Sequence, residues 1–202
     1  MTNVRYAFYL RPSDAMCHAQ RELHRLLQQQ YGLRAAGSLM PHATIKGFFR
    51  SDAAPQDIVA QVDPVIAGRS AFPVHSRGVQ SWLRSALVLD IQRLPDGSDN
   101  EALRALHWEA WQALAPLIHP ACDFTPFEWH GDYFTAHLTL AMGDIPPPLF
   151  DEIEQFVHDA EPIGPPDFTA DTLQLFAFRS YAWAGAWWEG LRWDLLHSWQ
   201  LE

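Results

Sequence analysis

The sequence predicts an α+β fold built from two similar lobes around a shared cleft. A chain of 202 residues with 48% hydrophobic content can form one compact domain or two small lobes. Its predicted elements run strand, helix, strand, helix, strand, and the same order then repeats, which is typical of a duplicated lobe. No glycine-rich phosphate loop follows a strand, so antiparallel lobes fit better than a doubly wound parallel sheet. We expect a single bilobal domain over residues 1–202, with lobes of about residues 1–83 and 84–202 that are able to exchange terminal strands.

The first half of the chain alternates strands with two helices. Runs of β-branched and aromatic residues predict the strands, and the apolar residues of the first helix end at Gly32. The third strand is irregular because Pro73 and Gly78 interrupt it. The predicted strands cover residues 4–10, 43–49 and 72–82, and the helices begin after Ser13 and near Pro55.

The second half repeats this order. Apolar residues at helical spacing from Leu103 to Leu117 predict one helix, and the prolines at 146–148 open another. The last strand is expected to pair with the one before it across the turn at residues 184–186. The predicted strands cover residues 86–92, 134–141, 172–178 and roughly 188–196.

The middle strand of each half carries the same four-residue motif, His-x-Thr-x. The copies are HATI at residues 42–45 and HLTL at residues 137–140. Because side chains alternate along a strand, the histidine and threonine of each copy point to one face and the apolar residues to the other. The same alternation places Lys46, the only lysine of the chain, on the face of His42 and Thr44. A compact cation there would stabilise negative charge developing on a phosphate.

These motifs and the element order resemble the 2H phosphoesterase superfamily, the 2',5' RNA ligase and cyclic phosphodiesterase group, over nearly the whole chain. The resemblance implies a bilobal fold of two antiparallel β-sheets flanked by helices, with both motifs inside a central cleft. It implies that His42 and His137 are the catalytic pair and that Thr44 and Thr139 bind the phosphate oxygens. Members of the superfamily have a basic residue shortly after the first motif, which is the position of Lys46.

Two histidines are sufficient for a metal-independent phosphoesterase. Histidine titrates near neutral pH, so one imidazole can act as base while the other acts as acid, and no metal or other cofactor is required. We expect hydrolysis of a cyclic phosphodiester, with RNA ligation as the reverse direction. Which histidine is the base stays open. The candidate substrates are a 2',3'-cyclic nucleotide, an RNA end, a tRNA splicing product and a cyclic phosphate of ADP-ribose.

Three further residues are candidates for the substrate pocket. His130 and Tyr133 lie just before the second motif, where they could line the pocket or stack on a base, although aromatic residues entering a strand usually pack. Arg179 follows a strand of the second lobe and is expected to contact the substrate. The C-terminal tryptophans are interpreted as cover for the sheet rather than as a binding platform. These tryptophans are Trp183, Trp187, Trp188, Trp193 and Trp199.

Two other functions stay open. His130, Asp132 and the downstream His197 could bind iron as in a non-haem oxygenase. That interpretation leaves the paired motifs unexplained and places two ligands in a glycine-containing loop. The other alternative is a non-catalytic module of the same fold that binds a nucleotide or phosphate without turnover.

Charge and composition narrow the partners and the location. The net charge of -10 is the opposite of the basic surface that long nucleic acids require, so a small phosphodiester or nucleotide is favoured, with RNA ends as a further candidate. Cys17 and Cys122 belong to no disulfide or zinc pattern and are expected to be reduced thiols. The sequence shows no signal-peptide pattern and no apolar run of membrane length, so we expect a cytoplasmic monomer without membrane contact.

Overall fold

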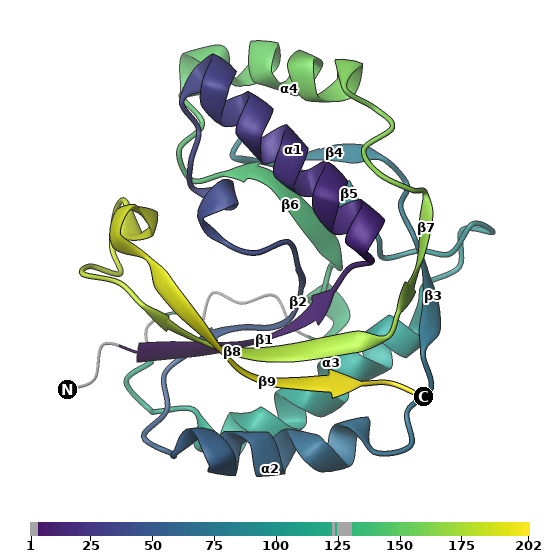
Figure 1. Cartoon of the computed structure of the whole chain (residues 1–202), viewed down its shortest axis with the longest axis vertical. Helices are drawn as coiled ribbons and strands as arrows, with labels where there is room; N and C mark the ends of the chain where they lie inside the picture. Colours follow the sequence, from purple (N-terminus) through teal and green to yellow (C-terminus); the bar gives the residue numbers. More distant parts are fainter. Residues whose placement is uncertain (1–3, 123, 125–130) are drawn as a thin grey trace.

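The structure, a computed structural model, describes residues 4–122, 124 and 131–202 and has the expected α+β architecture (Figure 1). Seven strands form one large sheet, and two short strands, β3 (Phe72–His75) and β7 (Asp167–Ala170), form a second one. The strands of the large sheet are β1 (Val4–Arg11), β2 (Ala43–Phe49), β4 (Val79–Trp82), β5 (Ala86–Asp90), β6 (His137–Met142), β8 (Thr172–Arg179) and β9 (Arg192–Gln200). The α-helices within the described residues are α1 (Asp14–Tyr31), α2 (Pro55–Ile66), α3 (Glu101–Leu114) and α4 (Phe150–Asp159).

The large sheet is antiparallel and nearly divides in the middle. Its strand order is β4-β5-β6-β2-β1-β8-β9. All neighbours pair over several residues except β2 and β6, which are joined only through Ala43 and Leu138. The two sheets expected from the sequence are therefore two halves of one continuous sheet, which a single residue pair joins. The first two strands of the chain lie beside the last two, so each half of the sheet is not one continuous half of the sequence.

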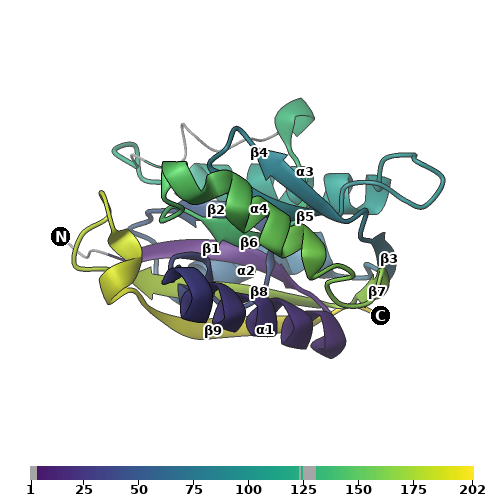
Figure 2. The same cartoon turned by 90° about the horizontal axis from the view of Figure 1, so that it is seen from above.

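The helices lie in two layers that also mix the halves of the chain. Helices α1 and α4 lie over the β4-β5-β6 half, where α1 contacts β6 and α4 contacts β4 (Figures 1 and 2). Helices α2 and α3 lie together at the other end of the molecule, where α3 contacts β2 and α2 contacts β9 (Figure 1). Each motif strand is thus covered by a helix from the other half of the sequence.

Local signals mark both ends of α1 and the start of α2 where the sequence predicts them. The Ser13 side chain accepts a hydrogen bond from the Met16 backbone N–H at the start of α1, and Gly32 ends that helix with φ 75°. Pro55 is the first residue of α2. At α3, the Asn100 side chain accepts from the Leu103 N–H at 3.2 Å.

Strand β6 begins at His137 rather than at Phe134, and α3 ends at Leu114 rather than at Leu117. Three larger differences concern the other strands. Residues 72–82 form two strands in different sheets, because the chain leaves β3 and turns at Gly78, which has φ 89°. Strand β7 was not expected from the sequence, since its four residues form a strand only by pairing with β3. The last strand begins at Arg192, after the short helix η6 (Trp187–Gly190), rather than near Trp188.

The interior consists of one main core and a smaller aromatic cluster. The main core lies between the large sheet and the helices and includes Phe8, Ile45 and Leu138. The smaller cluster lies on the other face of the β1, β2 and β8 strands and includes Tyr9, Phe48 and Phe178. No described helix is both long enough and apolar enough to cross a membrane.

Candidate active site

The two motifs meet where the sheet divides. The single pair between β2 and β6 joins Ala43 and Leu138, the second residue of each motif. In an antiparallel register this pair sets each motif histidine across from the threonine of the other motif. Because side chains alternate, both histidines and both threonines point to the face opposite Ala43 and Leu138, which are buried in the main core.

All four polar side chains of the motifs line one cavity of about 480 Å³. Its walls are largely aromatic and include Phe48, Trp82, Phe134 and Trp187. Among the described residues that line it there is no arginine or lysine. The polar side chains contributed by the motifs are His42, Thr44, His137 and Thr139.

Both motif histidines are held by the same kind of hydrogen bond. The Nδ1 atom of His42 donates to the Met40 carbonyl at 2.7 Å, and Nδ1 of His137 donates to the Thr135 carbonyl at 2.8 Å. A carbonyl only accepts, so the proton of each neutral ring sits on Nδ1 and the lone pair on Nε2. Within the described part of the chain, neither Nε2 atom has a hydrogen-bond partner. Each ring can therefore take or give a proton through Nε2.

An aromatic ring fixes the plane of each imidazole. Tyr9 of β1 stacks on His42 with ring centroids 3.9 Å apart. Trp82, the last residue of β4, meets His137 edge-on with centroids 4.3 Å apart. Neither residue is predicted from the sequence. In β1, buried residues occupy both faces, so alternation does not reveal which side chains reach the cavity.

Burial lowers the pKa of both histidines. It lowers the pKa of His42 to about 4, the hydrogen bond to Met40 opposes this, and the neighbouring His137 and His24 lower it further. Burial also lowers the pKa of His137, but its hydrogen bond to Thr135 and the nearby Asp90 carboxylate act in the opposite direction. Both rings are therefore neutral at pH 7 in the free protein, and only His137 has a carboxylate that favours its protonated form.

The structure places Lys46 away from the face where alternation put it. Phe8 and Tyr9 are consecutive in β1, yet their partners in β2 are Lys46 and Thr44, so Ile45 is an extra residue at a β-bulge. The bulge breaks the alternation and turns Lys46 toward the side of Phe8. The Lys46 side chain is fully buried, donates to the Gly47 carbonyl at 3.2 Å, and lies 5.4 Å from the Phe49 ring centroid.

The other expected substrate contacts are also placed differently, or lie outside the described residues. Arg179 forms an ion pair with Asp194 of β9; because Phe178 packs in the aromatic cluster, the next side chain points to the opposite face of the sheet. Tyr133 is 79% exposed and does not line the cavity. His130 lies outside the described residues. Trp187, interpreted as sheet cover, lines the cavity instead.

The alternative iron site has one member whose side chain the structure describes. His197 lies on β9 with its ring 4.4 Å from that of Trp199, and it does not line the cavity. Among the described residues, no three His, Cys, Asp or Glu side chains are grouped as metal ligands.

Helix side chains bond to the backbone of both motif strands where the sheet divides. On α1, Gln20 donates to the Thr139 carbonyl at 2.8 Å, and His24 bonds to the same oxygen at 3.1 Å. On α3, Nδ1 of His107 donates to the Ile45 carbonyl at 2.7 Å. These contacts are not predicted from the sequence, although a polar residue on the apolar face of a helix, such as His107, is an available signal.

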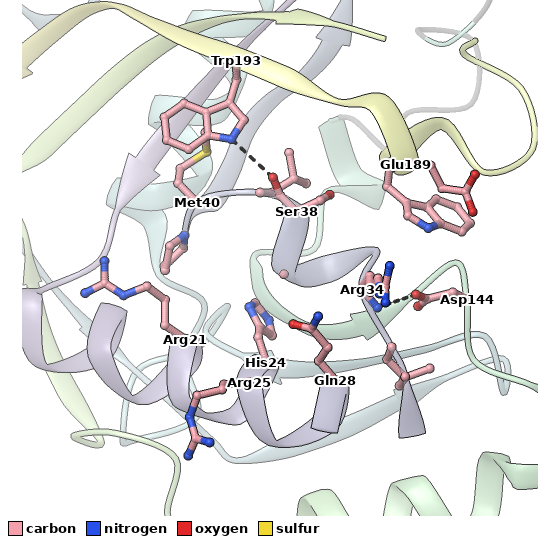
Figure 3. Close-up of a pocket in the computed structure, with 16 residues that line it drawn as sticks. Arg21, His24, Arg25, Gln28, Arg34, Ser38, Met40, Asp144, Glu189 and Trp193 are labelled. Carbon is pink, nitrogen blue, oxygen red and sulfur yellow. Dashed lines mark hydrogen bonds between the residues drawn. The ribbon is translucent and has the colours of Figure 1, made fainter. Parts of the chain in front are cut away.

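A second, larger cavity lies beside the first and shares Leu39 with it. It has a volume of about 1150 Å³ and contains neither motif. Figure 3 shows His24 and Gln28 of α1 pointing into it and Trp193 donating to the Ser38 carbonyl at 3.3 Å across its upper wall. The paired histidines make the smaller cavity the candidate active site.

Comparison with solved structures agrees with this fold. The chain is similar to LigT from Escherichia coli complexed with NADP+, with 19% identity, a TM-score of 0.55, and coverage of 100% of this chain and 99% of that one. It is also similar to TT0787 of Thermus thermophilus, with 17% identity, a TM-score of 0.58, and coverage of 98% and 97%. No curated protein sequence matches the chain.

A family model identifies the relationship from sequence. The model of the 2'-5' RNA ligase superfamily matches residues 12–181, which include both motifs. The match confirms the resemblance to this superfamily inferred from the motifs. The chain belongs to the 2'-5' RNA ligase superfamily.

Proposed function

We propose that the protein is a metal-independent phosphoesterase that hydrolyses a cyclic phosphodiester by two-histidine acid–base catalysis. The observation that carries this proposal is the matched anchoring of His42 and His137 in one cavity. Both donate Nδ1–H to a backbone carbonyl, and both leave Nε2 for a substrate. The Thr44 and Thr139 hydroxyls form no hydrogen bond within the described residues, so both are available to phosphate oxygens.

The electrostatics favour His42 as base and His137 as acid in the hydrolytic direction. The lowered pKa of His42 keeps Nε2 unprotonated and ready to take a proton from water. The Asp90 carboxylate favours a proton on His137, which passes to the leaving oxygen. The attacking water oxygen forms a bond to phosphorus as the phosphorus–leaving oxygen bond breaks. One water is added, and one proton moves from His137 to the product as another arrives on His42.

In this mechanism no lysine stabilises the negative charge of the phosphate. Lys46 is turned away, so the His137 imidazolium and the two threonine hydroxyls would stabilise the phosphate oxygens. A small nucleotide is the favoured substrate class. The cavity volume of about 480 Å³ suits a mononucleotide, and crystal structures of LigT are complexes with 3'-AMP, NADP+ and ATP.

A panel of cyclic phosphodiesters assayed in excess chelator tests this function. The panel contains nucleoside 2',3'-cyclic phosphates, an RNA with a cyclic phosphate end and a cyclic phosphate of ADP-ribose. We expect chelator-resistant hydrolysis of at least one of them, unchanged in His18→Ala, an exposed histidine of α1, and lost in His42→Ala. Nucleotide binding without turnover at any pH would instead support the non-catalytic module, and activity that requires ferrous iron would support the oxygenase.

A further inference from the structure

The hairpin turn between β4 and β5 has an unusual backbone conformation. Leu83 has φ 48° and Arg84 has φ 53°, and they are the described non-glycine residues with left-handed φ. The turn is closed by the Ser85 N–H, which donates to the Trp82 carbonyl at 2.8 Å. Glycine and asparagine adopt this conformation readily, whereas a leucine is strained in it.

Contacts with α4 stabilise Arg84 in this turn. Its guanidinium forms an ion pair with Asp151 of α4 and lies 4.9 Å from the centroid of the Phe150 ring. These contacts fasten the turn to α4 and offset the strain at that residue.

Leu83 has no comparable contact with any residue that the structure describes. Its side chain is 89% exposed, although it lines the cavity of the two motifs together with Trp82 and Ser85. A large apolar side chain that is both strained and exposed gains almost nothing from burial in the free protein. It would gain from burial if a ligand in the cavity covered it.

The turn stands on the side of the cavity where the leaving group must lie. Trp82 touches His137, the residue that protonates the leaving oxygen in the proposed mechanism. In a 2',3'-cyclic phosphate that oxygen belongs to a ribose, so the nucleoside extends from the phosphate on the His137 side. Leu83 is the exposed apolar group next to that position.

We propose that Leu83 is a specificity-determining residue that packs against the nucleoside of the substrate, so that the protein selects base-bearing cyclic phosphates over cyclic phosphates without a base. This inference rests on the proposed function for the chemistry and on the turn for the selectivity. It explains why a leucine occupies a position that suits asparagine or glycine.

Replacing Leu83 with asparagine separates strain from selectivity. Asparagine tolerates left-handed φ, so the Tm of Leu83→Asn should stay the same or rise by about 2 to 4 °C. The kcat/KM for cytidine 2',3'-cyclic phosphate should fall about tenfold, while that for methyl ribofuranoside 2,3-cyclic phosphate stays within about twofold of wild type. Leu83→Met should keep the preference. Leu26→Asn, at an exposed leucine of α1 that does not line the cavity, should not change it.

One result would overturn the proposal: an unchanged ratio of the two kcat/KM values in Leu83→Asn, whether both values stay the same or fall by the same factor. If wild type hydrolyses neither compound, calorimetric binding decides the role of Leu83, and the proposed function fails only if no other member of the panel is hydrolysed. In that case an affinity for 3'-AMP about tenfold weaker in Leu83→Asn, with unchanged affinity for inorganic phosphate, supports the proposal, and equal affinity for 3'-AMP in both proteins contradicts it.

Discussion

At the residue scale, His42 and His137 share a hydrogen-bond pattern but differ in their electrostatic surroundings. In the proposed mechanism the active form has His42 neutral and His137 protonated. The kcat/KM should therefore rise as the pH passes about 4 and fall as the pH passes the pKa of His137, which is lowered from 6.5. We expect a mildly acidic optimum in a profile of kcat/KM from pH 4 to 8.

Asp90 contributes to the position of the alkaline limb of that profile, together with burial and the hydrogen bond to Thr135. Its carboxylate raises the pKa of His137, so Asp90→Asn should lower that pKa and move the alkaline limb to lower pH. Asp167→Asn is the matched control, because Asp167 pairs with His75 outside the cavity and should leave the limb in place. An alkaline limb that does not move in Asp90→Asn would exclude His137 as the acid.

The motif side chains could be predicted from sequence, whereas Lys46 could not be placed. Alternation correctly puts the histidines and threonines on one face because residues 42–44 and 137–139 are regular. It fails at Lys46, two residues after Thr44, because Ile45 is extra relative to β1. The available signal was Gly47, since a glycine inside a strand often accompanies a bulge.

At the element scale, α1 supports the second motif from outside the cavity. His24 bonds the Thr139 carbonyl through Nε2, and Gln20 donates to the same oxygen. This oxygen lies beside the division of the sheet, where β2 provides no partner beyond Ala43. The bonds from α1 hold β6, and with it the Thr139 hydroxyl, in position.

Loss of the His24 bond should reduce catalysis more than folding. We expect His24→Ala to lower kcat roughly tenfold with little change in KM, because the bound phosphate would be held less well in the transition state. His24→Gln places an amide donor near Nε2 and should restore most of the activity. His18→Ala on the same helix should have no effect, and a failure of His24→Gln to recover more activity than His24→Ala would argue against positioning by this bond.

The order of the elements could be predicted from sequence, but not their partners. Capping residues and apolar spacing locate α1, α2 and α3. They do not reveal that α1 covers β6 or that α3 covers β2, because an apolar helix face fits either half of the sheet. The short strands β3 and β7 depend on each other and carry little signal of their own.

At the scale of the whole molecule, the burial of three histidines costs stability in acid. Burial lowers the pKa of His24, His42 and His137 below that of an unfolded histidine, so the unfolded chain binds more protons. The free energy of unfolding should therefore decrease as pH falls from 6.5 toward 4. For His42 alone, a shift from 6.5 to about 4 corresponds to about 3 kcal/mol.

Urea unfolding at pH 7, 5.5 and 4 measures this loss. Wild type should lose more stability over this range than His42→Gln, which has no imidazole to protonate. Other groups that titrate in the range are common to both proteins, so the difference isolates His42. Equal losses in the two proteins would contradict a buried, neutral His42.

The duplicated order of elements predicts that the molecule has two halves and that the two motifs meet between them. It does not predict that the strands of both halves join in one continuous sheet. A single residue pair joins the halves, and it falls on equivalent residues of the two motifs. No local pattern encodes that pairing, because it depends on the packing of both halves at once. The same pair is what brings the two histidines to one cavity.

A double-mutant cycle on the two histidines shows whether both imidazoles act on one phosphate. The kcat/KM of wild type, His42→Ala, His137→Ala and the double variant is measured in excess chelator on the best substrate of the panel. If both imidazoles act on one phosphate, each single variant should lose about 10²- to 10⁴-fold, and the double variant should lose little more than the worse single variant. Near wild-type activity in either single variant would contradict the account.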